Sequence, residues 1–210
     1  MRPGRGTTVT KQARSEQTRR LLLEAAAVLL WRDGYSDTSL IDIAHAAGIT
    51  KGGLYFHFSS KDQICDEVQE AAVAVLREHV DRGPTSSPRA LQRLADLGHA
   101  LMRWLDTDPR VGASFRLARE MGGKDARFVS FAVAWAAQVR QCVADARADG
   151  ELGADVPLDL ATLQAVVTCV GLESVFSTGV IRPDLGLQGA LAGLWRLNAR
   201  ALVDRFGTGD

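Results

Sequence analysis

The sequence predicts an all-α protein of about nine helices, with a small N-terminal helix-turn-helix head on a larger helical body. Three observations predict this class. Apolar residues recur at helical spacing through most of the 210 residues, glycine and proline separate these segments, and no segment shows the alternation typical of a strand. A composition of 46% hydrophobic and 24% charged residues is ordinary for a soluble globular protein with one or two cores.

The first predicted helix runs from about Ser15 to a turn at Gly34. Leu22 and Ala26 mark its apolar face, because residues four apart lie on the same side of a helix. The glycine suits the left-handed position that follows many helix C-termini. Residues 1–12 are rich in Gly, Arg and Thr and lack periodicity, so we expect a flexible basic tail there.

Two short helices joined by a tight turn are predicted next. Thr38 or Ser39 is expected to cap the first of them, and Gly48 lies in the turn that follows. Thr50 is expected to cap the second, which covers 51–56. The second helix is too short, and too polar at its start, to serve packing alone.

The body is predicted to contain six further helices, each preceded by a Ser, an Asp or a turn. Their starts are expected near Ser60, Ser87-Pro88, Asp108-Pro109, Asp125, Asp155 to Asp159 and Leu185. Their ends are expected near the breaks at 83–88, Gly122-Gly123, Gly150, Thr178, Arg182-Pro183 and Gly207.

Charge is distributed unevenly between the parts of the chain. Residues 1–61 contain nine Lys/Arg and five Asp/Glu, whereas residues 62–210 contain 16 and 20. A basic head on an acidic body suits a polyanionic partner for the head only. We therefore predict a tail over 1–12, a DNA-binding domain over 13–61, and an effector-binding and dimerisation domain over 62–210.

The start of the second short helix has the chemistry of a DNA-reading element. An α-helix fits the major groove, and helix-turn-helix modules place the N-terminal residues of their second helix at the base edges. Here that end is Thr50, Lys51, Gly52 and Gly53. The glycines allow close approach of the backbone at a helix-propensity cost of about 1 kcal/mol each, and the lysine can reach a base edge or a phosphate.

Aromatic and polar residues close this segment. Tyr55 and His57 can donate to phosphate oxygens, and Lys61 adds a charge at the start of the next helix. The alternatives are that Tyr55 packs in the core and that His57 lies unused in a polar turn. Phe56 and Phe58 are expected to be core residues that hold the short helix in place.

The run TSLIDIAHAAGITKGGLYFHFSSK, residues 38–61, resembles the DNA-binding head of TetR-family transcriptional regulators. EQTRRLLLEAAAVLLWRDGY is similar to the first helix of that family, so the resemblance covers about 14–62. It implies an all-α homodimer whose heads read a pseudo-palindromic operator of double-stranded DNA and whose body binds an effector. It also implies phosphate and base contacts, which makes the candidate DNA-binding residues Arg14, Thr38, Thr50, Lys51, Gly52, Gly53, Tyr55, His57 and Lys61.

The body shows no catalytic constellation, and we expect neither an enzyme nor a cofactor or metal. His79 and His99 have no cysteine or carboxylate at ligand spacing, and nothing like a nucleophile elbow is present. Cys65, Cys142 and Cys169 lie far apart within helical patterns. This spacing argues against a disulfide framework and a metal site, and reduced thiols are expected.

The expected location is cytoplasmic, and nucleoid-associated when DNA is bound. No segment approaches the length of a membrane span by inspection, and the first twenty residues lack the apolar core of a secretory signal. The predicted protein therefore has no membrane partner.

An effector pocket is predicted in the body. Residues 115–139 concentrate aromatic side chains in a chain with only 6% aromatics, although these could simply form the core. The runs VGASFRLARE and FVSFAVAWAAQVR, with YFHF at 55–58, resemble the γ-butyrolactone receptor branch of the family, found in antibiotic-producing actinobacteria. This resemblance implies that Trp135 covers a lactone ring and that Thr168 contacts the ligand. The candidate effector-binding residues are Trp135, Thr168, Phe115, Phe131 and Val139.

The last two long helices carry apolar stripes that suit a dimer. Leu163 and Val167 lie on one stripe, and Leu187 and Leu191 lie on the other. Two such helices from each subunit can form a four-helix interface across a two-fold axis, the alternative being packing within one subunit. The sequence thus predicts a ligand-responsive repressor released by a γ-butyrolactone-like molecule. The alternatives are a pseudo-receptor that responds to an antibiotic or biosynthetic intermediate, and a helical enzyme or interaction protein that uses the helix-turn-helix otherwise.

Overall fold

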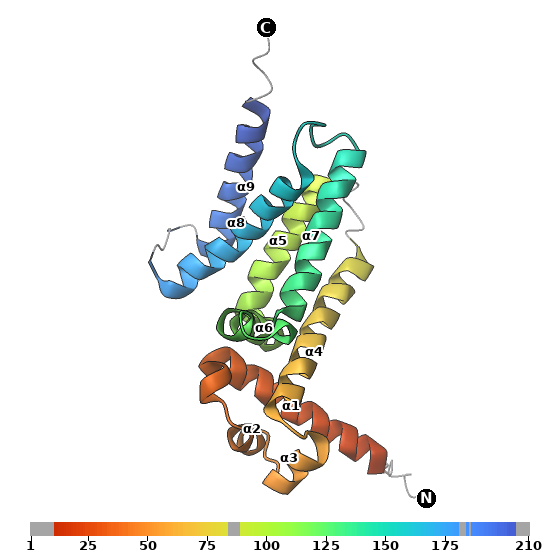
Figure 1. Cartoon of the computed structure of the whole chain (residues 1–210), viewed down its shortest axis with the longest axis vertical. Helices are drawn as coiled ribbons and strands as arrows, with labels where there is room; N and C mark the ends of the chain where they lie inside the picture. Colours follow the sequence, from red (N-terminus) through yellow and green to blue (C-terminus); the bar gives the residue numbers. More distant parts are fainter. Residues whose placement is uncertain (1–10, 84–88, 181–183, 185, 205–210) are drawn as a thin grey trace, which may run out of the picture. The chain divides into compact units, whose positions relative to one another are not determined.

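The computed structural model describes residues 11–83, 89–180, 184 and 186–204, with side chains as far as residue 198. Over these ranges the chain forms nine α-helices and one 3₁₀ turn, and no strand is found (Figure 1). The all-α prediction is therefore confirmed. The cap predicted at Ser87-Pro88 and the break at Arg182-Pro183 lie outside the described residues.

The chain divides into two compact units. One contains the residues as far as Ala72 together with 109–131, and the other contains 73–108 and the residues from Ala132 onward. The division falls within α4 (Lys61–Arg82). It differs from the functional boundary predicted at residues 61 and 62, because a segment from the middle of the chain packs with the head. The functional boundary remains a prediction.

The head of the first unit contains three helices before α4. These are α1 (Lys11–Asp37), α2 (Leu40–Ala46) and α3 (Lys51–His57). Gly34 has φ 86° and ψ −176°, so the regular part of α1 ends there as the sequence predicts. The chain then makes one further turn before α2.

Local capping fixes the two short helices. The Ser39 hydroxyl accepts the backbone N–H of Asp42, and the Asp42 carboxylate accepts the backbone N–H of Ser39, which completes a capping box. Of the two caps considered for this helix, Ser39 is therefore the one used. The Thr50 hydroxyl accepts the backbone N–H of Gly53, and the Ser60 hydroxyl accepts that of Gln63, so both of these predicted caps are confirmed.

Apolar side chains from all four helices form one core in this unit. Leu22 and Leu30 of α1 are fully buried, as are Ile43 of α2, Leu54 of α3 and Ile64 of α4. At about 25 cal/mol per Å² of apolar surface removed from water, this burial is the main term that holds α3 on the head.

Two elements from the middle of the chain complete the unit, namely α6 (Pro109–Met121) and the 3₁₀ turn η1 (Ala126–Val129). The guanidinium of Arg116 donates to the carbonyl oxygens of Trp31, Arg32 and Asp33 at 3.1, 2.5 and 2.9 Å. The Glu120 carboxylate accepts from Arg116 at 2.7 Å and from the Tyr35 backbone N–H at 2.8 Å. Helix α6 therefore satisfies carbonyl groups that α1 leaves open at its C-terminal end.

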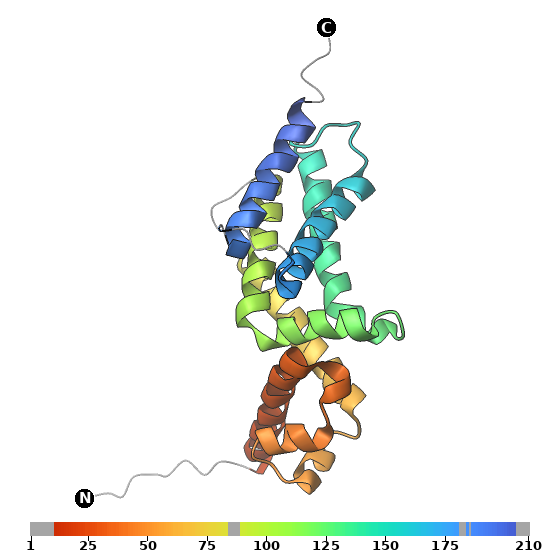
Figure 2. The same ribbon diagram turned by 90° about the vertical axis from the view of Figure 1, so that its left-hand side faces the viewer.

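The second unit contains the rest of α4 together with four long helices. These are α5 (Ala90–Thr107), α7 (Ser130–Ala148), whose first two residues belong to the first unit, α8 (Leu158–Thr178) and α9 (Gly186–Asp204). Helices α5, α8 and α9 pack against one another (Figures 1 and 2). Gly98 of α5 permits close packing, since a Cβ there would lie 3.2 Å from the Trp195 ring and 3.3 Å from the Cys169 sulfur.

Two helix starts in the body differ in detail from the prediction. The Glu151 carboxylate accepts the backbone N–H of Ala90 at 2.7 Å, so a distant side chain caps α5. The helix predicted from Asp125 is divided into η1 and α7, because the Asp125 carboxylate accepts the backbone N–H of Arg127 and starts a 3₁₀ turn first.

Candidate DNA interface and effector site

Helix α3 has one buried side and one exposed side. Leu54 and, directly after the helix, Phe58 are buried in the head core, which confirms the prediction for Phe58. Lys51, Gly52 and Tyr55 lie on the exposed side. The residues predicted to read DNA therefore share a surface, and the apolar residues on the other side hold that surface in place.

The two glycines of α3 have different structural reasons. A Cβ at Gly53 would lie 2.8 Å from Cγ2 of Ile49 and 3.3 Å from Oγ1 of Thr50, so packing in the turn excludes a side chain. A Cβ at Gly52 would meet no atom within 4 Å. Of the two glycines, only Gly52 leaves open space at the surface. Close approach of the backbone to DNA would therefore explain the glycine at position 52, at its cost in helix propensity.

Lys51 and Tyr55 form the polar part of this surface. The Lys51 Nζ lies 5.9 Å from the centroid of the Tyr55 ring, one helical turn away. Tyr55 is about half exposed, so the alternative that it packs in the core does not describe its placement. His57 is partly exposed, and its ring contacts Phe56 edge-on with centroids 5.1 Å apart.

Two predicted phosphate ligands point into the head. The Thr38 side chain is 2% exposed, and its hydroxyl donates to the carbonyl oxygen of Gly34 at 2.7 Å. The Lys61 Nζ donates to the carbonyl oxygens of Tyr35 and Thr38 at 2.6 and 3.0 Å. The ammonium also lies 3.8 Å from the centroid of the Tyr35 ring. A phosphate contact by either side chain would require these bonds to be exchanged, so both contacts remain predictions, as does that of exposed Arg14.

The expectation that Phe56 is a core residue is wrong. Its side chain is 79% exposed, more than any other large apolar side chain in the described part of the chain. The cause is its angular position, because Phe56 follows Leu54 by two residues, a rotation of about 200° around the helix axis. A hydrophobic residue was assigned to the core from its type, whereas the register of α3 turns it outward.

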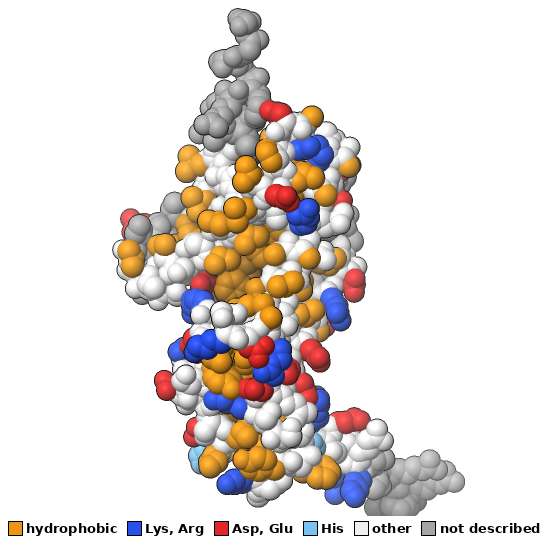
Figure 3. Space-filling view, viewed as in Figure 1, with side chains coloured by type: hydrophobic (Ala, Val, Ile, Leu, Met, Phe, Trp, Pro, Cys, Tyr) orange, Lys and Arg blue, Asp and Glu red, His pale blue; other side chains and the backbone are white. Residues whose placement is uncertain are grey.

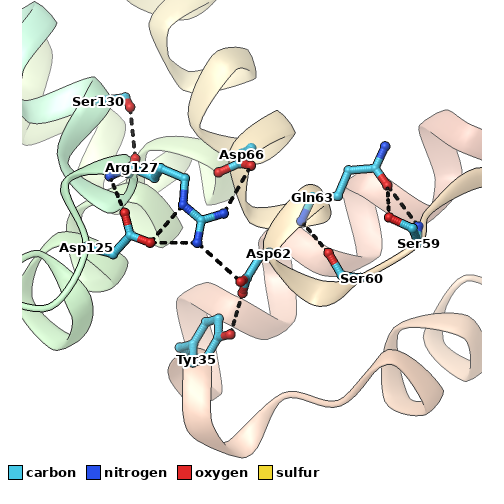
Figure 4. A network of polar contacts seen from close by, with 9 residues as sticks. All are labelled: Tyr35, Ser59, Ser60, Asp62, Gln63, Asp66, Asp125, Arg127 and Ser130. Carbon is cyan, nitrogen blue, oxygen red and sulfur yellow. Dashed lines mark hydrogen bonds and ion pairs between the residues drawn. The ribbon is translucent and has the colours of Figure 1, made fainter.

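An ion-pair network that the sequence does not reveal joins α4 to η1 within the first unit (Figure 4). The Arg127 guanidinium pairs with the carboxylates of Asp125, Asp62 and Asp66 at 2.6, 3.3 and 3.6 Å. The Tyr35 hydroxyl donates to Asp62 at 2.5 Å, and this hydrogen bond, together with burial, raises the pKa of Tyr35 to about 12. Its members are separated by up to 92 positions in the sequence, and no local pattern marks their proximity.

Two of the predicted effector residues lie in the first unit. Phe115 of α6 and Phe131 of α7 are buried, with their ring centroids 6.3 Å apart at an angle of 64°. The buried side chain of Gln69 donates to the Phe128 carbonyl oxygen and accepts the Phe131 backbone N–H at 2.8 and 3.1 Å. These bonds fix the start of α7. Sequence reasoning missed Gln69, which looks like a surface residue by type.

The other three lie in the second unit. Trp135 and Val139 are buried one helical turn apart on α7, and the Trp135 Nε1 has no acceptor among the described residues. The Thr168 hydroxyl of α8 donates to the carbonyl oxygen of Gln164 at 2.7 Å and lies 3.5 Å from Nδ2 of Asn198. The Trp135 indole N–H is thus a buried donor still open to an added acceptor, as is that of Trp195, whereas the Thr168 hydroxyl is already bonded.

The cysteines are structural in character. The described residues contain no group of three or more His, Cys, Asp or Glu side chains placed to hold a metal ion. Cys65, Cys142 and Cys169 are free thiols. Burial raises the pKa of Cys65 and Cys169 to about 12, which keeps both as poorly nucleophilic thiols.

Helix α8 carries an apolar stripe with no cover within its unit. Leu160, Leu163, Val167 and Val170 are exposed along one side, whereas Cys169 is buried on the other. Apolar side chains gather over α8 and its neighbours in Figure 3. Helix α8 has 21 residues and a mean hydropathy of 1.5, so by length and composition it could cross a membrane. The expectation that no segment approaches the length of a membrane span is therefore wrong.

Known proteins are similar to this chain over the head and over the fold. Residues 22–68 match the family described as bacterial regulatory proteins, tetR family. The A-factor receptor protein of Streptomyces griseus is 32% identical over 112 residues, which are 53% of this chain and 38% of that protein. The chain spans less than half the length of the first curated relatives that it matches.

Two solved structures share the fold over most of both chains. A γ-butyrolactone receptor described as ArpA-like is 27% identical, with a TM-score of 0.73 over 90% of this chain and 89% of that one. The TetR regulator TylP of Streptomyces fradiae is 34% identical, with a TM-score of 0.60 over 78% of this chain and 77% of that one. These likenesses agree with the arrangement of an N-terminal helix-turn-helix before a helical body.

Proposed function

Because the chain belongs to the TetR family of bacterial regulatory proteins and resembles its γ-butyrolactone receptor branch, we propose that it is a transcriptional repressor released from its operator by a γ-butyrolactone-like signalling molecule. The observation that supports DNA binding is the exposed side of α3, which carries Lys51, Gly52 and Tyr55. The opposite side of the helix is fixed in the head core by Leu54. We also propose that the targets include genes of secondary metabolism, because a solved structure 26% identical to this chain is described as the molecular basis for control of antibiotic production.

Operator binding is proposed to use two copies of the head. A helix-turn-helix presents one recognition helix for each half-site, and the half-sites of a dimer lie one helical turn of DNA apart, or a multiple of it. The free N–H groups at the start of α3 and the positive end of its dipole suit a phosphate. Lys51 is proposed to contact a base edge, and Tyr55 and His57 to contact phosphate oxygens.

A homodimer is supported by the apolar stripe of α8. The same helix packs Ala165, Cys169 and Leu172 inward, so α8 belongs to a protein core on one side and exposes an apolar surface on the other. In a two-fold dimer, the stripe of one copy would pack against the same stripe of the second copy. Helix α9, which packs beside α8, would complete a four-helix interface. This use also accounts for a hydropathy that would otherwise suit a membrane span.

The proposed effector contact is the Trp135 indole. Its ring face can cover a flat lactone, and its buried N–H can donate to a ligand oxygen. An effector that binds the released state more tightly shifts the population toward it, and it weakens operator binding by that difference in affinity only. We propose that Thr168 also contacts the ligand, as the resemblance implies. Ligand contacts by Phe115, Phe131 and Val139 stay predictions.

Substitutions in α3 are expected to separate positioning from base reading. Tyr55→Phe removes an uncharged phosphate donor, so it should weaken binding to all sequences about equally and leave the dependence on salt unchanged. Lys51→Ala should weaken operator binding by about 1–3 kcal/mol and also relax the preference at one base position. Gel-shift titrations would use a duplex selected by the wild-type protein from a random-sequence library, and wild-type behaviour of both variants would contradict the assignment.

The conservative substitution Trp135→Phe is expected to leave operator affinity unchanged and to abolish release by the effector. Phenylalanine keeps most of the buried apolar volume, whereas truncation to alanine would risk about 3–5 kcal/mol of stability. The measurement is release of the selected duplex over a concentration series of synthetic γ-butyrolactones, butenolides and furans. Release of the variant at wild-type concentrations would remove Trp135 from the site.

The same release assay, extended to the host's antibiotics and their biosynthetic intermediates, tests the remaining alternatives. Release by an antibiotic or a biosynthetic intermediate, and by none of the lactones, would identify a pseudo-receptor. Binding to random-sequence DNA that does not weaken with salt would argue against phosphate contacts altogether, and thus for an interaction protein.

A further inference from the structure

Phe56 is an exposed apolar residue of α3 to which the proposed DNA contacts give no role. Burying a phenylalanine is worth about 1.5–3 kcal/mol, so a side chain that is 79% exposed forgoes most of this gain. Within α3 the ring contacts only the edge of the neighbouring His57 ring among the aromatic contacts of the described residues. Nothing in the packing of the head calls for an aromatic residue at this position.

The Phe56 side chain points to the exposed side of α3, which is the surface proposed to contact DNA. Leu54 points into the head core, and Phe56 lies about 200° from it around the helix axis. Gly52 lies one turn before Phe56 on the same side, and the space that its side chain would fill is open. The Phe56 ring therefore stands beside the place where the backbone of α3 can come closest to a base pair.

We propose that Phe56 reads thymine through the C5-methyl group in the major groove. This inference rests on the proposed operator binding by α3 and names a base that this surface recognises. A phenyl ring has neither donor nor acceptor, so it cannot contact a phosphate or a polar base edge favourably. The one apolar group on the base edges of the major groove is the methyl of thymine.

The proposal divides the surface of α3 into polar and apolar parts. Lys51 and Tyr55 stand together, with the ammonium 5.9 Å from the ring centroid, and they supply charge and hydrogen bonds. Phe56 supplies sequence preference without charge. Its removal should therefore leave the salt dependence of binding unchanged, unlike the removal of a cationic side chain that neutralises a phosphate.

The test removes the methyl group rather than the side chain alone. Duplexes selected by the wild-type protein from a random-sequence library are resynthesised with deoxyuridine in place of each thymidine in turn, which deletes only the methyl. One thymine in each half-site is expected to show about a fourfold loss of wild-type affinity, the change that corresponds to one buried methyl group. Replacement in both half-sites should give about a 15-fold loss.

The variant Phe56→Ala is expected to bind the thymidine and deoxyuridine duplexes equally and to lose its preference at that position. Phe56→Leu, which keeps an apolar group, should retain a thymine preference. Val133→Ala is the matched control, since Val133 is 61% exposed on α7 and is outside the head. Its binding to both duplexes should equal that of the wild-type protein.

Each outcome decides one of the two proposals. If every thymidine replacement affects wild-type and Phe56→Ala protein alike, the reading of the methyl group is overturned while operator binding stands. The same holds if Phe56 acts as a wedge between bases, because Phe56→Ala would then weaken all duplexes without regard to the methyl. If the wild-type protein enriches no sequence from the library, both proposals fail together.

Discussion

Replacing Gly112 by alanine is expected to lower the free energy of unfolding by about 2–3 kcal/mol, which is a large part of the stability of a typical domain. A Cβ on this residue of α6 would lie 2.4 Å from both Cδ1 and Nε1 of Trp31 on α1, and 2.8 Å from Cε2. An indole ring cannot yield by that distance without leaving its rotamer or separating the two helices. The gain in helix propensity from alanine, about 1 kcal/mol, offsets only part of this loss.

Gly123→Ala gives the control for this substitution. Gly123 lies in the turn after α6 without a positive φ, outside the proposed dimer surface, and a Cβ there would meet nothing within 4 Å. Its replacement should change stability by less than about 0.5 kcal/mol. Both variants would be unfolded in urea at one fixed protein concentration, because a dimer's stability depends on concentration. Equal midpoints for the two would show that α1 and α6 do not pack as described.

Arg116→Ala is expected to lower the free energy of unfolding by about 2–3 kcal/mol. The guanidinium donates to three carbonyl oxygens at the end of the regular part of α1, where helices commonly leave carbonyl groups without intrahelical partners. A cation at this end also complements the helix dipole. The side chain is 30% exposed, so water replaces part of what is lost and the effect stays below the sum of three charged hydrogen bonds.

The pH dependence of this variant follows from Glu120. Burial alone would raise the pKa of the Glu120 carboxyl, but the hydrogen bonds from Arg116 and from the Tyr35 backbone N–H together lower it. A carboxyl with a lowered folded pKa stabilises the fold above its unfolded pKa, and that contribution is lost as pH falls through the folded value. The difference between Arg116→Ala and wild type should therefore shrink below about pH 4.

An exposed arginine serves as the control for Arg116. Arg140 pairs with Asp159, and both side chains are exposed, so Arg140→Ala should change stability by less than about 1 kcal/mol. Urea unfolding at pH 7 and at pH 3 would compare the two variants. A loss in Arg140→Ala as large as that in Arg116→Ala would mean that the α1 carbonyls are satisfied without the guanidinium.

Local features of the fold could be predicted because their causes are local. The caps by Thr50 and Ser60 and the break at Gly34 depend on residues within four positions of one another. The buried Phe58 was predicted for the same reason as Phe56, yet only one of the two is buried. Residue type sets the tendency to be buried, but the register of a seven-residue helix decides which of two neighbours faces the core.

Contacts between distant segments could not be predicted from this single sequence. The pairs of Arg127 with Asp62 and Asp66, the Arg116 bonds and the Glu151 cap join positions from 61 to 85 residues apart in the chain. A charged residue in a helical pattern looks the same whether or not it has such a partner. Gln69 is the same kind of case, with hydrogen bonds 59 and 62 residues away. Only the folded chain brings these groups together.

The candidate sites show a similar limit. Sequence reasoning placed Thr38 and Lys61 at the DNA surface from the resemblance, whereas their polar atoms bond to backbone carbonyls inside the head. Trp135 was named for its ring and N–H, and its buried Nε1 without an acceptor among the described residues is compatible with that role. Its role in ligand binding depends on a ligand oxygen that accepts this N–H, and a sequence does not reveal its ligand.

The membership of α6 and η1 in the same compact unit as the head has a consequence for protein engineering. A change of operator preference could be sought by exchanging the N-terminal part of this chain for that of another regulator. Here the exchange of residues as far as Ala72 alone would set a foreign α1 surface against Gly112 and Arg116. A functional chimera of this protein therefore needs two crossover segments, because residues 109–131 must travel with the head.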